Sequence, residues 1–297
     1  MKRSAHHFPT PVRGIWIAIL ASQIYSTLYA ITKLLKNYDP FQLSAISTVF
    51  SLVTLVLLST FLGKNDFFKV KFALKKTNYR VYFANVLLGI VGGVSGYYAL
   101  QLIGVAEFRT ITLTQALFTY LPAAFFLKEA FNPNKFLIVG LGFLGVILIF
   151  KPDLFSLWNL GCLLALLMVF SYTMTVILAS YKTRSDKVGN VIFTTACLRL
   201  PIVSLIAAFT WQPIYMEDLL LLFLFCFTGF TAVYLWVLAC KLAPASTIEP
   251  YSYLGLPIAT LYGYFLFENV PSISSWVGML VICLAAALLY RTSSDRA

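Results

Sequence analysis

Two related stretches decide the fold of this chain. The first, residues 105–150, reads VAEFRTITLTQALFTYLPAAFFLKEAFNPNKFLIVGLGFLGVILIF, and the second, residues 244–288, reads PASTIEPYSYLGLPIATLYGYFLFENVPSISSWVGMLVICLAAAL. Each is an apolar run that closes on F-L-x-E, followed by a proline and by a second apolar run that contains a glycine. These landmarks are Glu129, Pro133 and Gly140 in the first copy and Glu268, Pro271 and Gly278 in the second. The same order in each half predicts an internal duplication.

The composition places the chain in a lipid bilayer. Hydrophobic residues make up 60% of it, charged residues 11%, and the mean hydropathy is +0.85, far from the balance of a soluble domain. A helix needs about 20 apolar residues to cross a hydrocarbon core of about 30 Å, so the chain has room for about ten spans. The longest hydrophilic stretch, residues 63–80, is too short to bury a core of its own. We therefore expect an all-α integral membrane protein.

Ten apolar segments can be drawn, and their loops carry an uneven distribution of charge. The segments are 14–35, 41–62, 81–103, 105–127, 135–150, 160–180, 188–210, 219–239, 244–267 and 275–290. With a cytoplasmic N-terminus, seventeen of the 22 Lys and Arg residues lie on the cytoplasmic side, three lie outside, and two, Arg109 and Arg199, fall within segments. This bias predicts that both termini are cytoplasmic. It also explains the net charge of +11 without a nucleic-acid partner.

The duplication has a geometric consequence. A repeat of five spans must begin its second copy on the opposite face of the membrane, so the halves, residues 1–151 and 152–297, are predicted to be inverted relative to each other. Gly14 and Tyr25 in the first segment recur as Gly161 and Tyr172 in the sixth, at the same spacing. Inverted repeats are common in secondary transporters, whose substrate path lies between the halves. The alternative is an old duplication that was retained for packing alone.

On these features the chain resembles the drug/metabolite transporter superfamily and, within it, the EamA-type proteins. The resemblance rests on Leu127 to Glu129 with Gly140 and Gly145, and on Leu266 to Glu268 with Gly278. It implies ten transmembrane helices in two inverted five-helix repeats around a central cavity, with the fifth and tenth helices paired, in a bacterial inner membrane. Such proteins often carry an arginine in the second helix of a repeat. The region around Phe50 has none, whereas the seventh helix has Arg199.

Arg199 and Glu249 are the principal charged candidates for a binding site. Arg199 lies near the middle of its segment, where a charge costs about 3 kcal/mol on insertion scales and usually faces a cavity or a partner. It could anchor a carboxylate or phosphate, or be satisfied by carbonyl groups near Pro201. Glu249 lies five residues into its segment and beside Pro250. It could bind a cationic group or carry a coupling proton, or simply cap a helix start.

Polar residues of the fourth segment form a second set of candidates. Thr112 and Gln115, with Thr119, recur at helical spacing, as expected for a wet cavity or for a helix interface joined by hydroxyl groups. Glu107 and Arg109 lie near the outer end of the same segment and are too close in sequence to share a helical face. They are candidates for an outer gate, and the alternative is a solvated helix start.

Aromatic residues recur in both halves and could line a cavity for flat or cationic substrates. The candidates are Tyr25, Tyr97, Tyr172, Trp236 and Tyr253. Most of the 17 Tyr and 26 Phe residues are instead expected to face lipid, to pack, or to form interfacial belts.

Enzyme, cofactor and metal functions have little support in the sequence. Gly93 to Gly96 spell the G-x-S-G of intramembrane rhomboid proteases, but both histidines, His6 and His7, lie in the N-terminal tail, so the serine lacks a base in the membrane. The five cysteines lie in apolar segments without metal-type spacing. No Walker A sequence is present, so a gradient, through proton symport or a counter-substrate, is the simpler source of energy.

The sequence therefore predicts a secondary transporter of a small polar organic metabolite, most simply an amino acid or a derivative. Within the resemblance, S-adenosylmethionine uptake is a recurrent specialisation, for which Arg199 would bind the carboxylate and Glu249 with aromatic rings the cationic centre. Two other classes stay open: a non-transporting membrane scaffold subunit with a dry centre, and a flippase for lipids or lipid-linked sugars with a side opening. A homodimer is also left open.

Overall fold

The structure, a computed structural model, describes most of the chain as helices. The described residues are 11–62, 79–116, 118–119, 133–150, 160–182, 187–267 and 273–294. Every regular element within these ranges is a helix. Three landmarks of the duplication, Glu129, Glu268 and Pro271, lie outside the described residues.

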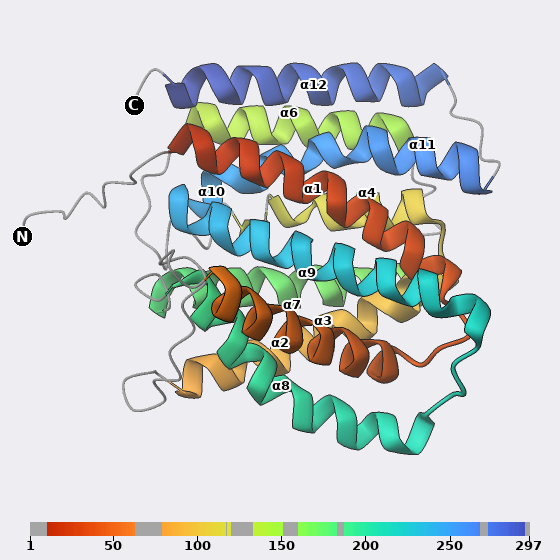
Figure 1. The fold of residues 1–297 in the computed structure, drawn as a ribbon. Coiled ribbons are helices and arrows are strands. Elements are labelled where there is room, and N and C mark those ends of the chain that lie inside the picture. Colours follow the sequence, from red (N-terminus) through yellow and green to blue (C-terminus); the bar gives the residue numbers. More distant parts are fainter. Residues whose placement is uncertain are drawn as a thin grey trace, which may run out of the picture.

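The helices lie side by side along one common direction (Figure 1). In chain order they are α1 (Pro11–Leu34), α2 (Pro40–Leu62), α3 (Tyr79–Leu102), α4 (Val105–Leu113), α6 (Pro133–Phe150), α7 (Leu160–Lys182), α8 (Val188–Thr210), η3 (Met216–Asp218), α9 (Leu219–Leu242), α10 (Ala245–Ile248), η4 (Glu249–Leu254), α11 (Gly255–Phe267) and α12 (Ile273–Ser294).

Six of these helices are long and apolar enough to cross a membrane. They are α1, α2, α3, α7, α8 and α9, and two shorter apolar stretches lie within α6 and α12. Large apolar side chains such as Phe61 and Phe209 stand exposed on the outside of the bundle, where lipid rather than water is the expected surrounding. The prediction of an all-helical, multi-pass membrane protein is confirmed.

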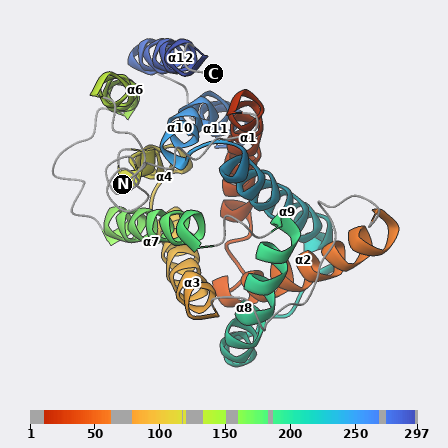
Figure 2. The same ribbon diagram turned by 90° about the vertical axis from the view of Figure 1, so that its left-hand side faces the viewer.

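The most extensive helix contacts join the first part of the chain to the second. Helix α1 packs against α9, α2 against α8, α3 against α7, and α6 against α12. Figure 2, which views the helices nearly end-on, shows α6 and α12 together at one edge of the bundle. The two halves of the chain therefore interleave instead of folding as separate bodies.

The segment expected as one helix over 244–267 is broken in the middle. It consists of α10, the 3₁₀-helix η4 and α11, because Pro250, which lacks an N–H, lies at the start of η4. Polar side chains of α1 satisfy the carbonyl groups at the break: Ser22 Oγ donates to Ser252 O (3.0 Å), Gln23 Nε2 to Leu254 O (2.9 Å) and Ser26 Oγ to Gly255 O (2.8 Å). In a bilayer such bonds allow a helix to be interrupted.

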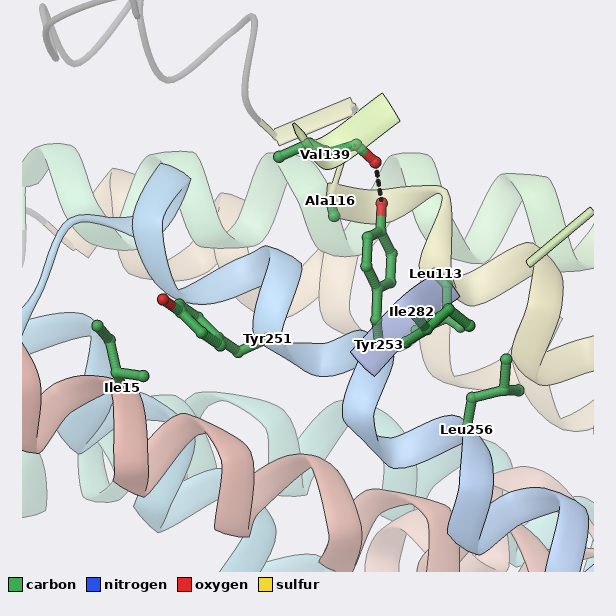
Figure 3. Packing of buried hydrophobic residues seen from close by; sticks show 8 residues of the cluster. All are labelled: Ile15, Leu113, Ala116, Val139, Tyr251, Tyr253, Leu256 and Ile282. Atoms are coloured by element: carbon green, nitrogen blue, oxygen red, sulfur yellow. Dashed lines mark hydrogen bonds between the residues drawn. The ribbon is translucent and has the colours of Figure 1, made fainter. Parts of the chain in front are cut away.

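A buried apolar cluster joins η4 to α6 and α12, and Ile15 of α1 belongs to the same cluster. Tyr253 is its largest member at the contact with α6, and its hydroxyl donates to Val139 O (3.4 Å), as Figure 3 shows. Ile282 of α12 and Leu256 of α11 pack in the same cluster. The broken segment is thus held by hydrogen bonds from α1 and by apolar packing against α6, α12 and Ile15 of α1.

Candidate functional site

A cavity of about 480 Å³ lies inside the bundle. Its wall is formed by residues of α1, α2, α3, α4, α7, α8 and α9 and by η4, so both halves of the chain contribute. The volume falls within the range of about 300–1,000 Å³ that is typical of small-molecule sites. The wall combines apolar groups with converging hydroxyl, amide and charged side chains.

Eight of the nine residues predicted to bind substrate line this cavity. They are Tyr25, Tyr97, Thr112, Gln115, Tyr172, Arg199, Trp236 and Glu249. These residues are far apart in the sequence and come together because polar and charged side chains in apolar helices avoid lipid and turn towards a common interior.

Tyr253 lies elsewhere, in the apolar cluster against α6. In a continuous α-helix over 244–267 it would lie one turn after Glu249, on the same face. Residues four apart lie about 40° apart around an α-helix but about 120° apart around a 3₁₀-helix. Because Glu249 to Leu254 form the 3₁₀-helix η4, Tyr253 turns away from the cavity wall while Glu249 faces it.

Arg109 lies in the wall of the cavity, and the alternative of a solvated helix start is wrong for it. Its side chain is only 4% exposed. Nη2 donates to Ser22 Oγ (3.3 Å) and to Ser252 O (3.2 Å), and the guanidinium lies 5.4 Å from the centre of the Tyr29 ring. The side chain of its predicted gate partner, Glu107, lies outside the described part of the structure.

Glu249 is the carboxyl group of the site. It is 2% exposed, and its Oε1 accepts a hydrogen bond from Nε2 of Gln115 (3.4 Å), which lies two residues after the end of α4. The alternative role of capping an interfacial helix start does not fit this burial. Glu249 is the first residue of η4, so the break in the helix directs it into the cavity.

Arg199 is held differently from Arg109. Within the described residues its guanidinium has no hydrogen-bond or ion-pair partner, and its Nε is shielded from solvent. Among the described residues no hydrogen bond joins it to a carbonyl group near Pro201, which lies inside α8. A side chain added at Gly93 would lie 3.5 Å from both Arg199 Nη2 and the Tyr172 hydroxyl, so these two groups flank the same bare stretch of α3.

Aromatic rings form one side of the cavity. Tyr25 meets Trp236 edge-on, with 6.3 Å between ring centres, and lies 6.2 Å from Tyr29, which in turn packs edge-on against Phe108. Tyr29 was missed by the sequence analysis, although it follows Tyr25 by one helical turn and therefore shares its face. Such a wall suits a flat ring or a cationic group.

Tyr97 has a second contact beside the cavity. Its hydroxyl donates to the Tyr38 carbonyl in the connection between α1 and α2. It therefore fixes that connection against α3 as well as lining the wall.

Comparison with known proteins gives a consistent result. A model of the EamA-like transporter family matches residues 12–151 and 159–291. A riboflavin transporter of Brucella anthropi is 27% identical over 231 residues, covering 75% of this chain and 80% of that protein. An S-adenosylmethionine uptake transporter of Rickettsia bellii is 26% identical over 249 residues, covering 84% and 83%. A solved crystal structure superposes with a TM-score of 0.76 at 17% identity, covering 93% of this chain and 97% of that one, which shows a shared fold.

Proposed function

Because this chain belongs to the EamA-like transporter family, we propose that it is a secondary active transporter of a small polar organic metabolite, an amino acid or a derivative of one. The observation that carries the proposal is the presence of Arg199 and Glu249 in the wall of one interior cavity. Charged groups at membrane depth are costly unless a ligand, a partner or water uses them. A scaffold subunit has no need of such a chamber.

The proposed architecture is ten crossings in two inverted repeats, with both termini in the cytoplasm of a bacterium. The helix contacts support it. In two equivalent halves, α1 corresponds to α7, α2 to α8, α3 to α9 and α6 to α12. If each helix is exchanged for its equivalent, the α1–α9 contact becomes the α7–α3 contact, and the α2–α8 and α6–α12 contacts are unchanged, as a two-fold axis between the halves requires. The halves, 1–151 and 152–297, would rock about this axis.

Two glycines support the same equivalence. A Cβ at Gly14 would lie 2.8 Å from Ala243 Cβ, directly after the end of α9, and a Cβ at Gly161 would lie 2.7 Å from Ile103 Cγ2, directly after the end of α3. Each half therefore opens with a helix whose glycine contacts the end of the third helix of the other half. These matched contacts favour a repeat that has kept its geometry.

The charges of the cavity favour a substrate with groups of both signs. Arg199 is the candidate partner of an anionic group and Glu249 of a cationic group, with the aromatic wall beside them. S-adenosylmethionine, which relatives are named as taking up, carries a carboxylate, two cationic centres and a flat base. Riboflavin, the substrate in the name of another relative, is the second candidate, because Tyr25, Tyr29 and Trp236 could hold its ring without the charges.

The energy source that we propose is a gradient, through a coupled proton or a counter-substrate. Glu249 is the candidate proton carrier, since it is a buried carboxyl group in the wall of the transport cavity. In this role the Glu249 carboxylate would bind either a proton or a cationic group of the substrate, but not both at the same time.

Uptake by purified protein in proteoliposomes tests the proposal. The probes are labelled S-adenosylmethionine, riboflavin and a panel of amino acids, with a fluorescent phospholipid to detect flipping. We expect uptake of one metabolite class that falls at least about tenfold in Arg199→Ala and Glu249→Ala. Tyr253→Phe is the matched control outside the cavity wall. No uptake of any probe would overturn the transporter, lipid flipping alone would favour a flippase, and wild-type rates in both variants would overturn the site.

A further inference from the structure

Arg109 and Glu249 face the cavity from two neighbouring segments of the chain. Arg109 of α4 bonds to Ser252 O of η4, and Gln115, two residues after the end of α4, bonds to Glu249, earlier in η4. Residues 109–115 and η4 therefore run past each other in opposite directions and bring a guanidinium and a carboxyl group to one part of the wall. Both side chains are almost completely buried, at 4% and 2% exposed.

The two charges are close but not joined. They interact electrostatically, yet within the described residues no hydrogen bond or ion pair links them directly. Arg109 is held instead by Ser22 and Ser252, and its Nε has no partner. A structural ion pair in a buried site would be expected in direct contact, because desolvation of both charges is repaid only by good geometry. Both charged groups line the same cavity and are not paired with each other.

We infer that Arg109 and Glu249 bind the head group of an α-amino acid, with Arg109 contacting the carboxylate and Glu249 the ammonium group. The inference rests on the proposed transport function and specifies its substrate class. A zwitterionic head group fits because each of its charges meets an opposite charge, and its binding adds no net charge to the buried site. A ligand with one charge would leave one of the two protein groups without a partner.

The surrounding residues agree with this assignment. The Tyr29 ring lies against the Arg109 guanidinium, which fixes its plane and favours a bidentate approach of a carboxylate. Gln115 Nε2 binds Oε1 of Glu249 and orients that carboxyl group. Arg109 thus replaces Arg199 as the partner of the carboxylate, and Arg199 is left to contact another part of the substrate, beside Tyr172 and the bare surface at Gly93.

The test compares truncated ligands with single substitutions in the full-length protein, reconstituted in lipid nanodiscs. The probes are S-adenosyl-L-methionine, its decarboxylated analogue and its deaminated analogue. We expect the wild type to bind each analogue at least about tenfold more weakly than the intact probe. Arg109→Gln should weaken binding of the intact probe by a similar factor without further weakening the decarboxylated analogue. Glu249→Gln should behave in the same way towards the deaminated analogue.

Arg199→Gln is the control, because it should lower the affinity for all three probes by one common factor. Arg109→Lys keeps the charge and should bind the intact probe better than Arg109→Gln, which separates recognition from misfolding. If the wild-type protein bound the intact and the truncated probes with equal affinity, that result alone would overturn the head-group site. Riboflavin uptake that is unchanged in Arg109→Gln and Glu249→Gln would overturn the head-group site and leave transport standing. Absence of uptake of every probe would overturn the proposed function itself.

Discussion

The side chain of Gln42 and the main chain of Gln212 are joined by two reciprocal hydrogen bonds. Gln42 Nε2 donates to Gln212 O (2.8 Å), and the Gln212 N–H donates to Gln42 Oε1 (3.0 Å). Gln42, in the first turn of α2, is fully buried, and Gln212 follows the end of α8. This pair joins the two halves of the chain at the end of the bundle away from the termini.

Gln42→Ala should therefore destabilise the protein. Loss of both bonds removes about 2 kcal/mol from the free energy of unfolding, which thermal unfolding of the purified protein would measure. The matched control is Gln212→Ala, because Gln212 takes part only through its main chain and its side chain is exposed. Equal destabilisation by the two substitutions would contradict the role assigned to the pair.

Tyr38 joins the same two regions through its hydroxyl group. The hydroxyl donates to Asp218 Oδ2 (2.6 Å) and accepts from the Tyr215 N–H (3.3 Å). Burial and the hydrogen bond to the Asp218 carboxylate raise the pKa of Tyr38. Its contribution to stability is therefore complete below the unfolded-state pKa of about 10 and is lost as the pH rises through the higher pKa of the folded state.

Tyr38→Phe should lower the unfolding temperature at neutral pH, and the difference from wild type should shrink above about pH 10. The measurement is the unfolding temperature of both proteins across the alkaline range, compared as a difference because other tyrosines and lysines titrate there too. A difference that grows with pH would show that the hydroxyl does not act as a donor to Asp218.

The helices and the membrane setting could be predicted from the sequence because both depend on local composition. A run such as 188–210 is apolar over the length of a bilayer, and α8 forms over Val188–Thr210. Arg199 and Glu249 could also be assigned to an interior site, since a charge within such a run avoids lipid. Neither inference requires knowledge of which helices touch.

The local geometry of η4 and the surroundings of Arg109 could not be predicted. Pro250 indicated a weakness in the helix, but the change from an α to a 3₁₀ turn, which moves Tyr253 out of the cavity wall, depends on bonds from Ser22, Gln23 and Ser26 in a distant helix. Arg109 looked like a solvated helix start because its burial comes from η4 and α1, which are remote in sequence.

Gly145 lets α6 and α12 pack closely, and Gly145→Ala should separate them. An added Cβ would lie 2.9 Å from Gly278 O and 2.9 Å from Ile282 Cγ1, so main chain as well as side chain would have to move. The expected loss is about 1–3 kcal/mol, as for other overpacked sites, read from thermal unfolding. Gly140→Ala in the same helix meets nothing within 4 Å and should be neutral or up to about 1 kcal/mol stabilising. Similar results for both variants would exclude close packing at Gly145.

Arg199 and Arg109 should respond in opposite ways to the same substitution, because only Arg109 is bonded to protein. Arg199→Met removes a cation whose Nε has no hydrogen-bond partner in the described structure, and should raise the free energy of unfolding by about 1 kcal/mol while it lowers uptake. Arg109→Met breaks the bonds to Ser22 and Ser252 and should lower the free energy of unfolding by about 2 kcal/mol. Thermal unfolding without substrate, with uptake measured on the same preparations, tests the pair. Destabilisation by Arg199→Met would mean that this arginine serves the fold, and the assignment of its guanidinium to the substrate would then fail.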